Sequence, residues 1–171
     1  MVRSLSFIYL FVILAVGFIG GAILFREMPP TTIEKLIVFF DGRVVYGHQA
    51  GFIRPVAMTA LFFIVAYVFS LIRQTRFIIL FLGAVKAVLF GLASAFLLGT
   101  GMKILDYSIW WFPFQFLTSF LFLVYCAVLN PPFFLRNNRG KKQDSKALPI
   151  LVIIMVVITS IEIAIFYFLL K

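Results

Sequence analysis

The chain has 171 residues, of which 64% are hydrophobic and only 12% are charged. A soluble domain of this length keeps a large wet surface, so the composition excludes a soluble globular fold. The formal charge of +9 does not indicate nucleic-acid binding. Most basic residues stand in short connections between apolar runs, where they suit anionic lipid headgroups. We therefore expect an all-α, polytopic membrane protein with no nucleic-acid partner.

Five apolar runs are long enough to cross a bilayer as helices, and together they form one integral membrane domain over residues 1–171. They cover approximately residues 5–25, 55–72, 77–98, 109–129 and 147–170. The basic start of the first run and the small residues near its end also fit a cleaved signal peptide. Its apolar centre is longer than is usual for a signal peptide, so we expect a retained helix.

The connection between the first two runs contains a short amphipathic helix. A proline pair ends the first run, and Thr31 followed by Glu34 has the spacing of a capping box that opens a helix over 31–40. Asp41 and the glycine after it end this segment. Its apolar residues recur at helical spacing: Ile33, Leu36, Ile37 and Phe40. Such a helix either lies in the membrane interface with its apolar side down or caps the helix bundle.

Small residues recur at every fourth position along the third run: Gly83, Ala87, Gly91, Ala95 and Gly99. A stripe of this kind forms a shallow groove in which a second helix approaches closely. The first run carries a matching pair, Gly17 and Gly21. We expect the first helix to occupy the groove, with a second copy of the chain as the alternative.

Two charged residues lie well inside apolar runs, Lys86 in the third and Glu162 in the fifth. Charges in hydrocarbon face protein, water or headgroups because an unpaired charge is costly there. The two side chains could form a buried ion pair or line a polar cavity. Alternatively, each side chain extends separately to its own membrane surface. The sequence leaves both interpretations open.

The fourth run begins with residues typical of a membrane interface. Asp106 marks the outer boundary, and Trp110 and Trp111 fit an aromatic belt. Pro113 falls in the first turns of the expected helix, where a proline costs little backbone bonding. Gln115, two residues further on, is a third intramembrane polar side chain.

No pattern in the sequence predicts catalysis. The single histidine, His48, has no second histidine, paired cysteine or acidic cluster with which to bind a metal. Cys126 lies within an apolar run and suits core packing. We found no nucleophile elbow, phosphate-binding glycine loop or HExxH motif. We expect a protein that is not an enzyme and has no cofactor and no metal site.

A dense basic group follows the fourth run: Arg136, Arg139, Lys141, Lys142 and Lys146. Because positively charged loops stay in the cytoplasm, it predicts a cytoplasmic N-terminus and an external C-terminus. We expect this loop to contact anionic lipid headgroups or a cytoplasmic partner.

The order of these features resembles the stage II sporulation protein M family of bacterial membrane proteins. The third helix carries most of the resemblance, through Lys86, Gly91 and the Phe96-Leu97 pair. Pro113 and Gln115 are separated by one residue, whereas the family has an adjacent Pro-Gln pair. Three further elements complete the pattern: the first helix ending Gly20-Gly21-Ala22, the outer loop ending Phe39-Phe40, and a basic loop before the last helix.

The resemblance implies a non-enzymatic scaffold of the bacterial plasma membrane. In endospore formers such proteins anchor peptidoglycan-degrading enzymes, the stage II sporulation proteins D and P, during engulfment. The implied partners are therefore membrane or extracytoplasmic proteins such as cell-wall hydrolases. The alternative is a transporter or channel subunit, suggested by Lys86, Glu162 and Pro113.

Overall fold

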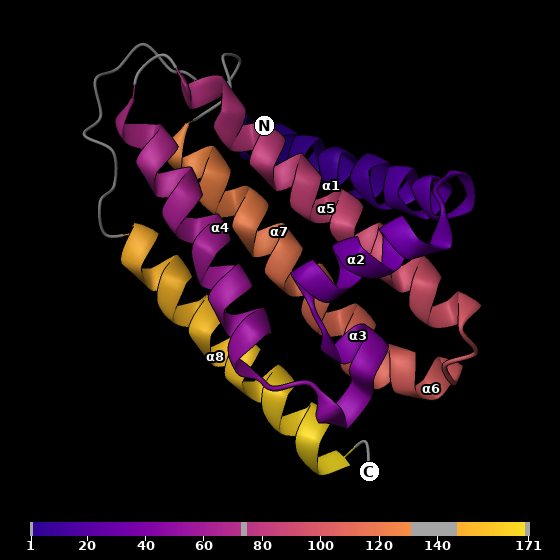
Figure 1. Cartoon of the computed structure of the whole chain (residues 1–171). Helices are drawn as coiled ribbons and strands as arrows, with labels where there is room; N and C mark the ends of the chain where they lie inside the picture. The colour runs from indigo at the N-terminus through magenta and orange to yellow at the C-terminus, as the bar shows by residue number, and fades with distance from the viewer. Residues whose placement is uncertain (1, 73–74, 131–146, 170–171) are drawn as a thin grey trace.

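The computed structural model describes residues 2–72, 75–130 and 147–169, and every regular element within these ranges is a helix (Figure 1). Five helices in this part of the chain are long and apolar enough to cross a membrane. The predicted all-α, polytopic bundle is confirmed. The long helices are α1 (Val2–Glu27), α4 (Ile53–Leu71), α5 (Arg76–Gly99), α7 (Phe112–Leu129) and α8 (Ala147–Leu169).

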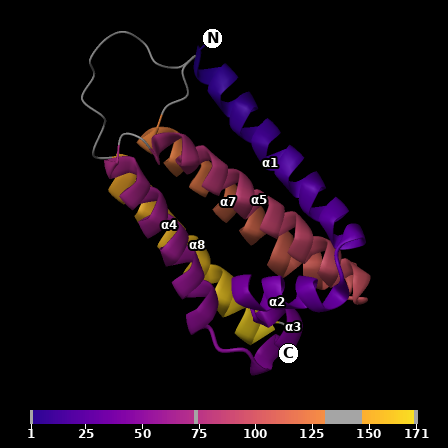
Figure 2. The same cartoon turned by 45° about the horizontal axis from the view of Figure 1, so that its top comes forward.

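Helices α5 and α7 occupy the centre of the bundle (Figures 1 and 2). Helix α1 lies along α5 on one side, and α8 packs on α7 on the other. Helix α4 contacts both central helices. The ends of the chain lie at opposite ends of the bundle, as an odd number of spans requires (Figure 1). We call the end where α8 finishes the C-terminal end of the bundle.

The short helices α2 (Pro30–Phe40) and α3 (Arg43–Tyr46) form a compact segment, the α2–α3 cap, at this C-terminal end (Figure 2). The apolar side of α2 faces the bundle core, because Ile33, Ile37 and Phe40 are all buried. A 3₁₀ turn (Gly47–Gln49) follows.

The predicted capping box at the start of α2 is wrong. The helix begins one residue earlier, at Pro30, and has no side-chain capping bond. Proline presets the backbone angle of the first helical turn and lacks the N–H that a cap would satisfy. Thr31 and Glu34 are therefore inside the helix and exposed.

The fourth span begins at Ile104, five residues before its expected start, with α6 (Ile104–Asp106) and a π-helical turn (Tyr107–Trp111). Pro113 cannot donate to the carbonyl four residues before it. The turn is widened there, and the N–H of Phe112 bonds to the carbonyl of Tyr107 instead.

The prediction that Trp110 and Trp111 belong to a lipid-facing aromatic belt is wrong. Their exposed fractions are 1% and 0%, so both indoles belong to the core. An ordinary helical turn separates consecutive side chains by about 100°. The π-helical turn contains one extra residue, and both indole rings face the core there. The indole N–H of Trp111 donates to the Ser94 hydroxyl at 3.1 Å.

Candidate functional site

Polar side chains from four parts of the chain are buried towards the C-terminal end of the bundle. Asp41 and Arg43 come from the α2–α3 cap, Lys86 from α5, Gln115 from α7 and Glu162 from α8. The charged members are 1–2% exposed and the glutamine is 6% exposed. We call these five residues the buried polar cluster.

Asp41 and Arg43 form a two-point ion pair within the α2–α3 cap. The Oδ2 atom of Asp41 accepts from Nη2 of Arg43 at 2.7 Å, and Oδ1 accepts from Nε at 3.0 Å. Oδ1 also accepts from the backbone N–H of Arg43 at 3.0 Å. Because Asp41 ends α2 and Arg43 begins α3, this pairing fixes the turn between the two helices.

The guanidinium of Arg43 also joins the cap to the last helix. Its Nη2 donates to Oε1 of Glu162 at 2.6 Å, across 119 positions of sequence. The amide of Gln115 donates to the same carboxylate oxygen at 3.3 Å. Burial alone lowers the pKa of Arg43, but the hydrogen bond that it donates to Asp41 and the charges of Glu162 and Asp41 raise this pKa above its ordinary value. Arg43 is therefore charged and links the cap to α8, while Glu162 accepts from α7 as well.

Aromatic rings enclose the guanidinium of Arg43. Its Cζ lies 5.6 Å from the ring centroid of Trp110 and 5.3 Å from that of Phe166. The ring of His48 stacks on that of Phe166, and their centroids are 4.7 Å apart. These faces favour a cation and exclude water, which strengthens the ion pairs inside.

Lys86 lies beside the ion pairs but has a different environment. Its Nζ is 5.3 Å from the ring centroids of both Phe40 and Phe62 and 6.0 Å from that of Phe122. No carboxylate of the described residues is within ion-pair distance of this ammonium group. Its charge nevertheless interacts with those of Asp41 and Glu162.

Lys86 and Glu162 are both buried, but they do not form the ion pair considered from the sequence. Glu162 pairs with Arg43 rather than with Lys86. The alternative in which each side chain extends to a membrane surface is wrong, because both are at most 2% exposed. The α2–α3 cap brings a cation to Glu162 inside the bundle, so Glu162 need not reach the solvent.

The sequence pattern does not single out Asp41 and Arg43 as members of a site. It indicates only that Asp41 ends the short helix, and it gives Arg43 no role. A signal was present, because Asp-Gly-Arg interrupts an otherwise apolar stretch, IVFFDGRVV, at 37–45. Opposite charges two residues apart inside such a stretch are able to pair locally before they are buried.

Counted as ionised side chains, the two carboxylates of the cluster, Asp41 and Glu162, balance its two cations, Arg43 and Lys86. A neutral, hydrogen-bonded cluster avoids the cost of a single buried charge, but removing one member leaves another uncompensated. The charged groups of the cluster are at most 2% exposed, and its hydrogen bonds join the α2–α3 cap, α7 and α8.

The small residues of the first and third spans lie at a close helix contact between α1 and α5. A Cβ added to Gly17 would come within 2.6 Å of the Cβ of Ala87. One added to Gly21 would overlap the carbonyl oxygen of Val88, and one added to Gly91 would overlap that of Phe18. The two backbones therefore touch directly.

The ends of the stripe serve other contacts. Gly83 faces α7, where an added Cβ would lie 2.5 Å from a methyl carbon of Leu123. Gly99 lies against the ring of Phe25, and Ala95 is half-buried. The stripe is thus shared between two neighbouring helices because its line winds around α5.

The other candidate residues from the sequence are not part of the buried polar cluster. The basic residues Arg136, Arg139, Lys141, Lys142 and Lys146 lie outside the described residues. Cys126 is buried in the core, and Asp106 is half-buried. Within the described ranges, no three His, Cys, Asp or Glu side chains gather where they could hold a metal ion.

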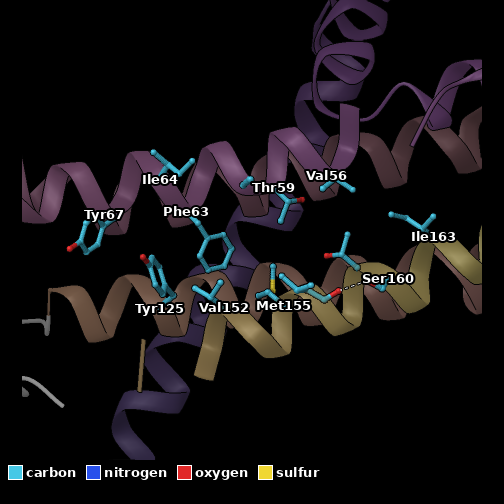
Figure 3. A pocket seen from close by; sticks show the side chains of 13 residues that line it. Val56, Thr59, Phe63, Ile64, Tyr67, Tyr125, Val152, Met155, Ser160 and Ile163 are labelled. Atoms are coloured by element: carbon cyan, nitrogen blue, oxygen red, sulfur yellow. Dashed lines mark hydrogen bonds between the residues drawn. The ribbon is translucent and has the colours of Figure 1, made fainter. Parts of the chain in front are cut away.

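A cavity of about 400 Å³ separates α4 from α8 (Figure 3). Figure 3 shows Phe63 of α4 pointing towards Met155 of α8 across this gap. Its polar lining is limited to hydroxyl groups, and Ser160 already donates to the carbonyl of Val156 at 2.8 Å. No charged residue lines the cavity.

Comparisons of the chain with protein-family models, with curated proteins and with solved structures found no match.

Proposed function

We propose that the protein is a non-enzymatic membrane scaffold. The observation that carries this proposal is the closed ion-pair network of Asp41, Arg43 and Glu162. It ties the α2–α3 cap, which lies between two membrane spans, to the last helix. A cap held in this way is a rigid platform at the membrane surface, because releasing it would expose three charges to an apolar core.

The burial of the cluster supports a structural role over a chemical one. A catalytic or transport site needs substrate access, and its charged groups change partners during turnover. Here Arg43 is enclosed by rings and held by two carboxylates, and Lys86 is packed among three phenylalanines. The charges therefore stabilise one arrangement of the helices.

The resemblance to stage II sporulation protein M extends the proposal to location and partners. We propose a multi-pass protein of the bacterial plasma membrane with its N-terminus in the cytoplasm. The α2–α3 cap would then face outwards, where it could position extracytoplasmic enzymes such as cell-wall hydrolases. The basic loop of 136–146 would contact anionic lipid headgroups on the cytoplasmic side.

Co-purification tests the scaffold. We expect the full chain, purified from solubilised bacterial membranes, to retain a membrane or extracytoplasmic protein that an unrelated helical bundle does not retain. Glu162→Gln should reduce this recovery because it weakens the attachment of the cap. Glu27→Gln, which changes an exposed carboxylate outside the cluster, should leave the recovery unchanged. A wild-type chain that retains no partner would overturn the proposal.

The alternative is a transporter or channel subunit, and the buried pair of cations, Arg43 and Lys86, is the observation in its favour. Flux of ions or small solutes into vesicles that contain the purified chain tests it. The scaffold predicts no flux above that of empty vesicles. Flux that Lys86→Leu abolishes would replace the scaffold by a transport function.

A further inference from the structure

A second hollow, separate from the buried polar cluster, lies between α2, α3 and α4. Its volume is about 640 Å³. The lining of this groove combines charged, hydroxyl and apolar side chains: Thr31, Glu34, Lys35, Val38, Phe39, Tyr46, Arg54 and Met58. Since the apolar side of α2 packs on the bundle core, the groove lies along the other side of this helix. We call it the α2–α4 groove.

The groove holds two cations without an internal partner. Lys35 and Arg54 are both exposed, and neither forms an ion pair with any described residue. The guanidinium of Arg54 is directed towards the turn between α2 and α3, where its Nη1 would lie 3.9 Å from a Cβ on Gly42. Two unpaired cations beside one hollow favour a ligand with a phosphate group.

The position of the groove restricts the ligand further. Arg54 is the second residue of the span Ile53–Leu71, and α2 begins three residues after the span that ends at Glu27. The groove therefore lies at the boundary of the membrane. Phe39 is 62% exposed and lines the groove together with Val38 and Met58. A soluble phosphate would leave this apolar side uncovered, whereas an acyl chain would cover it.

The single acidic residue of the groove selects among phospholipids. Glu34 is exposed, lies next to Lys35 in sequence and has no ion-pair partner among the described residues. A headgroup with a second negative charge would be repelled by this carboxylate, while a headgroup ammonium would be attracted. With two cations and one anion, the groove is complementary to a zwitterionic headgroup.

We propose that the α2–α4 groove binds one amine-bearing glycerophospholipid. Lys35 and Arg54 hold its phosphate, Glu34 holds its ammonium group, and an acyl chain lies against Val38, Phe39 and Met58. The site lies in the membrane leaflet at the C-terminal end of the bundle. It does not depend on the scaffold function, because the lipid occupies the groove whether or not a protein partner is bound.

Lipid addition to the purified full chain in detergent micelles tests the site. We expect phosphatidylethanolamine to raise the midpoint of thermal unfolding and to appear as one retained lipid in native mass spectrometry. The double variant Lys35→Gln/Arg54→Gln should bind it at least tenfold more weakly. The charge-matched control Arg26→Gln/Lys103→Gln, which changes two exposed cations outside the groove, should bind it like the wild type.

Three other results would each overturn the proposal or part of it. Equal lipid binding by the double variant and the wild type would exclude the groove. Stabilisation by inorganic phosphate as large as that by the lipid would identify a soluble-anion site. Equal affinity for phosphatidylglycerol and phosphatidylethanolamine would remove the role of Glu34. Both substituted cations are exposed, so the unfolding midpoint without lipid should match that of the wild type and separate lost binding from lost folding.

Discussion

The first and last helices both lie on the outside of the bundle, yet they are attached by different means. Helix α1 meets α5 backbone to backbone, because Gly21 and Gly91 leave no side chain between them. Helix α8 packs on α7 and is joined to the α2–α3 cap through the carboxylate of Glu162, and a cavity of about 400 Å³ separates it from α4. The attachment of α1 depends on close packing along the helix, whereas that of α8 adds an ion pair at one position.

The difference shows what each kind of contact contributes in a membrane. Lipid tails are as apolar as leucine, so apolar side chains alone provide little drive for two helices to associate. Close packing supplies dispersion energy for α1, which requires small residues at every contact. A buried ion pair fixes the position of α8 against the cap, so side-chain packing along the rest of that helix can be less close.

The largest effect is expected when the charge attachment of α8 is broken. Glu162→Ala leaves one uncompensated positive charge in the cluster and removes one acceptor of Arg43 and the acceptor of the Gln115 amide. We expect the free energy of unfolding in detergent micelles to fall by about 3–5 kcal/mol. Glu27→Ala, which removes an exposed carboxylate outside the cluster and the groove, is the control. A loss no greater than that of the control would show that the network does not hold α8.

The close contact of α1 is tested by two neighbouring glycines. Gly21→Leu would drive a side chain into the backbone of α5, whereas a Cβ on Gly20 meets nothing within 4 Å. We expect Gly21→Leu to cost about 1–3 kcal/mol of unfolding free energy or more, and Gly20→Leu to cost much less. Thermal unfolding of the two variants, measured side by side, gives the comparison. Equal midpoints would contradict the glycine contact.

The loose side of α8 should accept additional volume. Ala60 lines the cavity between α4 and α8, while Ala57 is an exposed alanine of α4 that does not line it. We expect Ala60→Leu to raise the free energy of unfolding by about 0.5–2 kcal/mol because it fills the cavity. Ala57→Leu should have little effect. A destabilised Ala60→Leu variant would contradict an open cavity between α4 and α8.

The smallest effect is expected at a buried hydroxyl outside the charge network. Ser119 lies on α7, which packs against both α1 and α8, and its Oγ is buried without a hydrogen-bond partner. We expect Ser119→Ala to leave the free energy of unfolding unchanged or to raise it by up to about 1 kcal/mol. Thr118→Ala, which removes a donor to the carbonyl of Gln115, is the matched substitution and should lower it. The reverse order would contradict the view that buried polarity stabilises only when it is paired.

The sequence predicted the elements of the fold but not the site that joins them. The long apolar runs identified five helices, because lipid leaves no other partner for their backbone groups. The spacing of Gly17 and Gly21 identified α1 as the neighbour of α5. One prediction failed because a single residue changed the local helix geometry. A π-helical turn precedes Pro113 and places Trp110 and Trp111 inside the bundle.

By itself, the sequence determined that this chain is a bundle of apolar helices with two ionisable residues inside its spans. Only the tertiary structure decided that Glu162 pairs with Arg43, a residue 119 positions away in a connection between two spans. Local patterns report on neighbours within a few turns of a helix. The cost of a buried charge depends instead on which partner the whole fold brings to it.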